Sequence, residues 1–236
     1  MKVGLAVFEF INNDIEYNLS QIERAINRAG DIDLLCFGEA FVQGFDSLCW
    51  KYDIDKDVAI SQDSIIFKRL KQLSIMYKID LLFGYIEIDK EHIYSSCCVI
   101  EKGNIIFNYR RISDGWKEID KTDSHYKEGE VIESFNYHGF PITIALCGDL
   151  WVYKEKFKTN GLIIWPVYVN YSIEEWNDEI NEYVRQANYV CNDVLFVNSL
   201  SKTPVSVGGA FYCKKYNIIE RLDFNKEDIL VCEIGN

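Results

Sequence analysis

Apolar and polar residues are spaced along this chain in two ways, one typical of helices and one typical of strands. Apolar residues three and four positions apart predict amphipathic helices over 14–28, 63–77 and 174–191. Short apolar runs between turn residues predict strands over 2–8, 32–37, 79–86, 93–101, 103–109, 133–137, 141–146, 161–166, 194–200, 208–213, 218–222 and 228–233. Strand, helix and strand at the start, followed by antiparallel pairs, predict an α/β fold with a mixed sheet or two sheets flanked by helices.

Length and charge narrow the class of protein. The 236 residues contain no repeat and no Pro/Gly/Ser-rich linker, so we predict a single domain over 1–236. The net charge of −12 argues against nucleic acid and anionic membrane surfaces as partners, since both require a basic face. No apolar run approaches the roughly 20 residues that a membrane-spanning helix needs.

The eight cysteines suggest the cellular compartment. Most of them lie inside apolar runs, and the chain has no CxxC pair, so neither zinc-site spacing nor a thiol-redox motif is present. Met1–Phe8 is already strand-like and does not resemble a signal peptide. We therefore expect reduced cysteines and a cytoplasmic protein without a metal.

The strongest candidate for chemistry is Cys147, which follows the predicted strand 141–146 in the stretch ALCGDLW. Ligands of α/β sheets bind at the carboxyl ends of strands, where this thiol would lie. We expect Gly148 to allow a sharp turn, and a following helix would help to hold a thiolate at its N-terminus. Asp149 is expected to brace this turn. Taken alone, the stretch fits a cysteine that only packs in the core at least as well.

Two further strand ends carry groups that would complete a site. Glu39 follows the strand 32–37, and a desolvated carboxylate can act as a general base for a thiol. Arg110 and Arg111 follow the strand 103–109, and a cation there would stabilise the oxyanion of a tetrahedral intermediate.

In their order and spacing, these stretches resemble the nitrilase, or carbon–nitrogen hydrolase, superfamily over essentially the whole chain. FGEAFVQGF is similar to its glutamate motif, with Gly38 in place of the usual proline, and ALCGDLW is similar to its nucleophile motif. NYRRISDGWKE is similar to its lysine motif. The resemblance implies that Glu39 is the general base and Cys147 the nucleophile, and that Arg111 occupies the position of the catalytic lysine.

The resemblance also implies a four-layer αββα sandwich and a reaction without a metal or organic cofactor. The Cys147 thiolate would attack a small amide, carbamoyl compound or ω-amide, with a nitrile the least expected substrate, and water would then hydrolyse the thioester. Glu118 is the match to a second glutamate that positions substrate in many members. Trp116 in the same loop, and Tyr168 and Asn170 in IIWPVYVN, are further substrate-binding candidates. A homodimer through the helices after Cys147 is expected.

Arg111 is the main departure from the family pattern. Arginine is larger than lysine and planar, and we expect it to form a bidentate pair with Glu39 or Glu118 if it points inward. Such a pair would weaken Glu39 as a base. Two interpretations therefore stay open: a hydrolase with a modified triad, or a protein of the same fold that binds a small ligand or a partner. Participation of Lys117, or of His125 in a Cys–His pair, is a further alternative.

Overall fold

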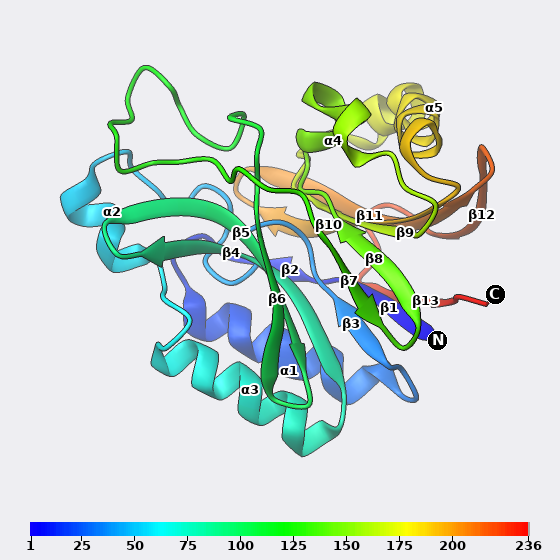
Figure 1. The fold of residues 1–236 in the computed structure, drawn as a ribbon, viewed down its shortest axis with the longest axis horizontal. Coiled ribbons are helices and arrows are strands. Elements are labelled where there is room, and N and C mark those ends of the chain that lie inside the picture. Colours follow the sequence, from blue (N-terminus) through cyan, green and yellow to red (C-terminus); the bar gives the residue numbers. More distant parts are fainter. Residues whose placement is uncertain (236) are drawn as a thin grey trace.

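The computed structural model describes residues 1–235, in which two β-sheets lie face to face between two layers of helices (Figure 1). The six-stranded sheet has the order β13-β1-β3-β4-β5-β6. The seven-stranded sheet has the order β12-β11-β10-β9-β8-β7, and β2 pairs with β10. Helices α1 and α3 cover the first sheet, and α4 and α5 cover the second (Figure 1). This is a four-layer αββα sandwich, and the predicted fold class is confirmed.

The elements have the following bounds. The strands of the first sheet are β1 (Lys2–Val7), β3 (Leu34–Cys36), β4 (Asp80–Asp89), β5 (His92–Glu101), β6 (Asn104–Arg110) and β13 (Asp228–Glu233). Those of the second are β2 (Glu9–Phe10), β7 (Ser134–Tyr137), β8 (Phe140–Ile144), β9 (Leu162–Val167), β10 (Asp193–Lys202), β11 (Val205–Lys214) and β12 (Asn217–Leu222). The helices are α1 (Ile15–Ala29), α2 (Tyr52–Val58), α3 (Ile65–Tyr77), α4 (Asp149–Val152), the 3₁₀ turn η1 (Lys154–Phe157) and α5 (Ile173–Val190).

The predicted elements agree with the observed ones to within a few residues, but the apolar pattern missed β2 and α2. Strand β2 has two residues, too few for an alternating pattern. Helix α2 buries Asp55 in place of an apolar stripe. The Asp55 carboxylate accepts hydrogen bonds from the backbone nitrogens of Cys49, Trp50 and Lys51, which holds the start of the helix. The single domain over 1–236 stays a prediction.

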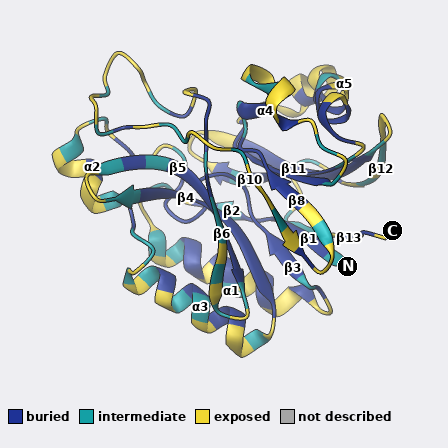
Figure 2. Ribbon diagram, in the orientation of Figure 1, coloured by how far each residue is buried: buried dark blue, intermediate teal, exposed yellow. Residues whose placement is uncertain are grey.

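The core has two main parts. One lies between the sheets and continues under α5, and the other lies under the helices of the first sheet. Figure 2 shows buried strands, while α1 and α3 expose their outer faces. On α1, Leu19, Ile22 and Ala25 are buried, which confirms the stripe predicted for 14–28. Parallel pairing of β1 with β3 and of β3 with β4 carries the carboxyl end of β3 into the middle of the first sheet.

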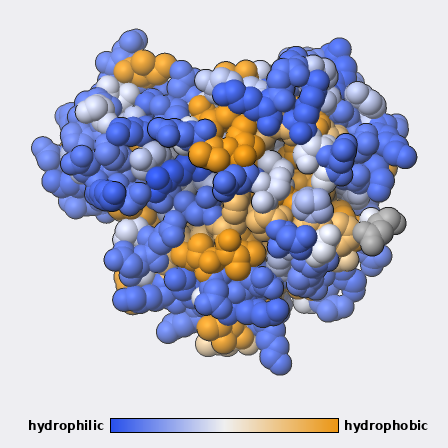
Figure 3. All heavy atoms as spheres, viewed as in Figure 1, coloured by the Kyte–Doolittle hydropathy of each residue, from blue (hydrophilic) through white to orange (hydrophobic). Residues whose placement is uncertain are grey.

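The surface seen in Figure 3 is mostly hydrophilic, with separate hydrophobic patches, one of them over β6. Ile106 of this edge strand is partly exposed. Within residues 1–235, no helix combines the length and the apolar character that crossing a membrane requires.

Candidate active site

The structure brings together Glu39, Arg111 and Cys147, which follow strands β3, β6 and β8. Glu39 N donates a hydrogen bond of 3.2 Å to the carbonyl of Val167, and Cys147 N donates one of 3.0 Å to the carbonyl of Pro166. These two carbonyls are neighbours at the end of β9. The loop that carries Glu39 in the first sheet and the loop that carries Cys147 in the second are therefore both hydrogen-bonded to the end of β9.

Glu39 and Arg111 form a buried ion pair. Arg111 Nη1 lies 2.8 Å from Glu39 Oε1, and the side chains are 3% and 0% exposed. Ser95 Oγ donates to the same carboxylate oxygen, and Arg111 Nε donates to Ser113 Oγ. The predicted bidentate contact is wrong, because Arg111 meets only one oxygen. The other, Oε2, is buried and has no hydrogen-bond partner among residues 1–235.

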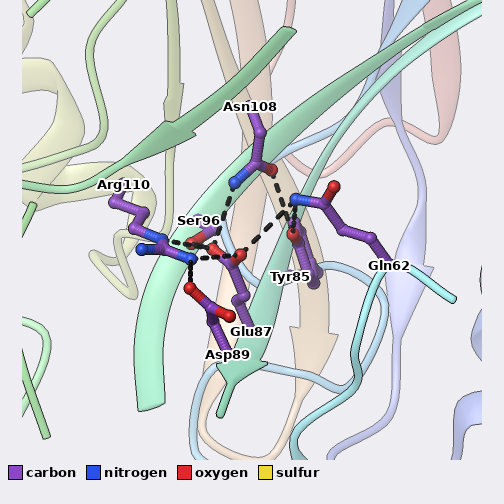
Figure 4. Close-up of polar contacts among 7 residues, drawn as sticks. All are labelled: Gln62, Tyr85, Glu87, Asp89, Ser96, Asn108 and Arg110. Carbon is purple, nitrogen blue, oxygen red and sulfur yellow. Dashed lines mark hydrogen bonds and ion pairs between the residues drawn. The ribbon is translucent and has the colours of Figure 1, made fainter. Parts of the chain in front are cut away.

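Arg110 and Arg111 project to opposite faces of the first sheet. Only Arg111 therefore contacts Glu39. Arg110 donates through Nε and Nη2 to Glu87, at 2.9 and 2.8 Å, and through Nη2 to Asp89 (Figure 4). Glu87 also accepts from Ser96, the neighbour of the Ser95 that binds Glu39. Because alternate residues of a strand face opposite sides, Arg110 anchors the edge strand while Arg111 reaches Glu39.

The turn after β8 was predicted to bend at Gly148, but the structure bends it at Cys147. Cys147 itself has φ +38°, in the left-handed region that side chains rarely adopt, whereas Gly148 has an ordinary φ of −64°. Gly148 is needed for room: a Cβ there would lie 2.5 Å from Arg111 Nη2. Helix α4 has four residues, so its dipole contributes little to holding a thiolate.

The electrostatic surroundings of the thiol keep it protonated. Burial and the nearby charge of Glu39 raise the pKa of Cys147 to about 12, and the charge of Arg111 opposes this rise. At that pKa, roughly one thiol in 10⁴ to 10⁵ is ionised near neutral pH. The Sγ atom lies 3.8 Å from the carbonyl of Tyr168. A thiol with this pKa would require a base in order to act as a nucleophile. Glu39 Oε2 is a buried acceptor without a hydrogen-bond partner among residues 1–235.

Asp149 braces both the cysteine loop and the arginine loop, as predicted. Its Oδ2 accepts from Tyr109 Oη at 2.6 Å and from Leu146 N at 2.9 Å. Its Oδ1 accepts from the backbone nitrogens of Ile112 and Ser113. Burial raises the pKa of Asp149, and these donors act against that rise. The carboxylate thus ties the residues after β6 to the turn that carries Cys147.

Glu118 and Trp116 form no hydrogen bond or ion pair with these three side chains among residues 1–235. The Glu118 carboxylate is 53% exposed, pairs with Lys121, and accepts a hydrogen bond from Trp50 Nε1. Trp116 is buried next to Trp50, in a cluster separate from the main cores. Neither residue lines the cavity at Cys147.

Lys117 and His125 are also engaged elsewhere. Lys117 Nζ lies 2.7 Å from Glu128 Oε1 and donates to the carbonyl of Tyr126. The His125 ring stacks on Tyr52, and its Nδ1 lies 2.8 Å from Asp123. Neither alternative member of the triad contacts Cys147 in the described structure.

Tyr168 and Asn170 lie beyond the end of β9, and only Tyr168 contacts Cys147. The backbone carbonyl of Tyr168 contacts the thiol, but its ring stacks on Phe45 and its hydroxyl meets Ser201. Asn170 is exposed. Tyr168 therefore touches the site through its backbone.

Sequence reasoning missed three polar side chains that support the site. They are Ser95, Tyr109 and Ser113, which contact Glu39, Asp149 and Arg111. The available signal was polarity at buried strand positions, since Ser95 and Ser96 interrupt an apolar run in β5.

One group of side chains has atoms close enough together to hold a metal ion. Asp80, Glu101 and His138 place one ligand atom each within 4.8 Å of one another. Asp80 already accepts from Lys102 N and Tyr137 Oη. The group shares no residue with the Glu39, Arg111 and Cys147 site.

Comparison with known proteins identifies the family. The family model described as carbon-nitrogen hydrolase matches residues 3–177, so the chain belongs to this family. The chain is 24% identical over 155 residues to a glutamine-dependent NAD(+) synthetase of Thermotoga maritima, covering 64% of this chain and 26% of that protein. It is 29% identical over 146 residues to a nitrilase of Meyerozyma guilliermondii, covering 57% and 44%. The chain thus spans about a quarter to a half of the length of these curated relatives.

A solved structure shows the same fold along the whole chain. An amidase from Nesterenkonia sp. AN1, with acrylamide added at its active-site cysteine, superposes with a TM-score of 0.78. The two sequences are 15% identical, and the match covers 100% of this chain and 93% of the amidase chain.

Proposed function

We propose that this protein hydrolyses a small non-peptide amide, with Cys147 as the nucleophile. The observation that carries the proposal is Glu39 Oε2, a buried carboxylate oxygen with no hydrogen-bond partner among residues 1–235, whose charge raises the pKa of the Cys147 thiol. An unpartnered buried acceptor is costly, and such groups are concentrated at functional sites. The amidase and nitrilase relatives support an amide or related C–N substrate.

In the first half of the reaction, Glu39 Oε2 takes the proton from the thiol as Cys147 Sγ attacks the carbonyl carbon. The carbonyl oxygen becomes an oxyanion. When the tetrahedral intermediate collapses, the C–N bond breaks and the amine leaves with the proton returned by Glu39. A thioester on Cys147 remains.

In the second half, water attacks the thioester carbonyl and gives its proton to Glu39. Collapse breaks the C–S bond, releases the carboxylic acid and restores the thiol with that proton. The sum of both halves is amide plus water giving acid plus amine. No further reactant is consumed.

Arg111 is assigned a supporting role in both halves. Its Nη1 holds Glu39 Oε1 and leaves Oε2 free, and its Nη2 lies beside Gly148, next to the nucleophile. A guanidinium nitrogen at this position favours the negative charge that develops on the oxyanion. Burial is the largest single effect and lowers the pKa of Arg111, but the charges around it, that of Glu39 first among them, together raise it.

Turnover tests this proposal. Amine or ammonia release from a panel of small amides is measured for the wild type and for Cys147→Ala, with circular dichroism as the folding control. We expect Cys147→Ala to abolish release while the fold stays intact. Release at the wild-type rate from Cys147→Ala would show that the mechanism is wrong.

A second candidate function is binding without turnover. The Glu39–Arg111 ion pair favours it, because a base paired with a guanidinium is less ready to accept a proton. A protein of this kind would bind small amides but release no amine from any of them.

A further inference from the structure

Cys147 lines a cavity between α4, α5 and the segment that precedes α5. Its volume is about 340 Å³, at the small end for ligand sites. The residues that line it are Cys147, Trp151, Tyr171, Glu179, Glu182 and Tyr183.

The charge of this lining is negative. It contains two carboxylates, and none of its residues is lysine, arginine or histidine. Glu179 has no salt-bridge partner among residues 1–235, whereas Glu182 pairs with Arg185 of the same helix. Arg111, the cation beside the thiol, is already paired with Glu39. A carboxylate on a substrate would therefore meet uncompensated negative charge here, and a cation would meet a free carboxylate.

Aromatic rings complete the lining. Trp151 lies edge-on to Tyr183, with ring centroids 5.0 Å apart, and Trp151 is 37% exposed. Rings of this kind attract ammonium and guanidinium groups through their faces, and the attraction adds to that of a nearby carboxylate.

Tyr183 relates the nucleophile to the acidic end of the cavity. Burial raises the pKa of its phenol, and the negative charge of Glu179 adds to this rise. Tyr183 lines the same cavity as Cys147 and Glu179. A small molecule that fills this cavity would meet Cys147, the Tyr183 ring and the Glu179 carboxylate.

We infer that the substrate of this site is a small amide that carries a cationic group, a primary ammonium or a guanidinium. The amide carbonyl lies at Cys147, and the cation lies between Glu179 and the aromatic rings. This inference rests on the proposed function for the reaction, but the charge preference concerns binding alone.

Binding to Cys147→Ala separates the two claims, since this variant has no nucleophile. The ligands are three matched amides: 4-aminobutanamide with a cation, pentanamide without charge, and glutaramate with an anion. Calorimetric titration gives the affinity for each. We expect the cation to bind about tenfold more tightly than the neutral amide, and the anion to bind more weakly than both.

Two charge variants in the Cys147→Ala background locate the effect. Glu179→Gln is expected to reduce the preference for 4-aminobutanamide over pentanamide to about threefold or less. Glu174→Gln removes the same charge five residues earlier, about 140° around the helix, and is expected to keep the preference. Glu174 is exposed and does not line the cavity.

Equal affinities for the three amides, or no measurable binding of any, would overturn the inference. An equal loss of preference in both variants would also overturn it, because that result assigns the effect to overall charge. A failure of turnover with the charge preference intact would contradict the proposed function only.

Discussion

Arg111 binds one oxygen of Glu39 and leaves the other free, inside a pocket that almost completely buries both side chains. A contact through one oxygen is compatible with the proposed role of Glu39 as a base, because Oε2 has no hydrogen-bond partner among residues 1–235. A bidentate pair would occupy both oxygens, whereas here Ser95 and Arg111 share Oε1. The geometry leads to predictions for the base, the arginine, the bracing carboxylate and the packing behind the base.

Removing the charge of Glu39 is expected to make Cys147 easier to ionise but to stop turnover. Glu39 raises the pKa of Cys147 and Arg111 lowers it, so in Glu39→Gln only the lowering effect of these two remains. The pH at which the thiol titrates should fall by about 1–3 pH units. Turnover should fall by a factor of about 10² or more, because the base is lost.

The measurement is the rate of Cys147 alkylation against pH, followed by peptide mass spectrometry. Glu174→Gln serves as the control for a change of one surface charge. An unchanged or higher midpoint in Glu39→Gln would show that Glu39 does not act on this thiol.

Arg111 is expected to work through its positive charge. Arg111→Met keeps much of the side-chain length but removes the charge and leaves Glu39 unpaired. We expect a loss of about 10²–10³ in kcat and about 3–5 kcal/mol in the free energy of unfolding. Arg111→Lys keeps the charge and should retain kcat to within about tenfold of the wild type.

Steady-state kinetics and urea unfolding of both variants test this assignment. A gain of more than tenfold in Arg111→Lys would instead support the view that arginine has disabled the site. Equal kcat in Arg111→Met and the wild type would remove Arg111 from the mechanism.

We expect substitution of Asp149 to lower the free energy of unfolding, because its role is to brace two loops and not to contact substrate. In Asp149→Asn, one of the two acceptor oxygens becomes an amide donor that faces the existing donors Tyr109 and Leu146, or Ile112 and Ser113. The free energy of unfolding should fall by about 2–4 kcal/mol. Asp120→Asn, at an exposed position of the same loop region, should change it by less than about 0.5 kcal/mol. A full loss of turnover in Asp149→Asn without a change in stability would assign this residue to substrate instead.

Gly84 is expected to tolerate no side chain, because the base loop packs against it. A Cβ at Gly84 would lie 2.5 Å from Ala40 N and 2.7 Å from Glu39 Cα. Gly84→Ala should destabilise the protein by about 1–3 kcal/mol and lower kcat as the loop shifts. For comparison, Gly235→Ala should change neither the free energy of unfolding nor kcat, since a Cβ there meets nothing within 4 Å. Unchanged unfolding and kinetics in Gly84→Ala would mean that the loop is not held in this way.

Apolar spacing predicted a mixed sheet or two sheets flanked by helices, and the family resemblance predicted the four layers. Buried strands and amphipathic helices follow from apolar spacing, and this spacing located β3 and β8, hence Glu39 and Cys147. Asp149 was also interpreted correctly, because a short acidic side chain at a turn has few roles other than accepting backbone hydrogen bonds. Elements without an apolar pattern were missed, as α2 shows with its buried Asp55.

Positions that depend on the path of a loop could not be predicted. Glu118 follows Arg111 by seven residues, but the loop turns outward and exposes its carboxylate. Apolar spacing left the choice between Arg110 and Arg111 open, because it depends on which face of the sheet each meets and the partner Glu87 comes from a different strand. Only the family resemblance indicated Arg111. The positive φ of Cys147 likewise arises from packing around the turn, and only glycine would have signalled it.

The most direct test of the central claim is intact-protein mass spectrometry during incubation with small amides and a chloroacetamide probe. Cys147→Ser is measured alongside, and peptide mapping locates any added mass among the eight cysteines. We expect an adduct on Cys147, absent from the variant, and an acyl mass where an amide is turned over. A chain that stays unmodified at Cys147 while the exposed Cys49 reacts would contradict it.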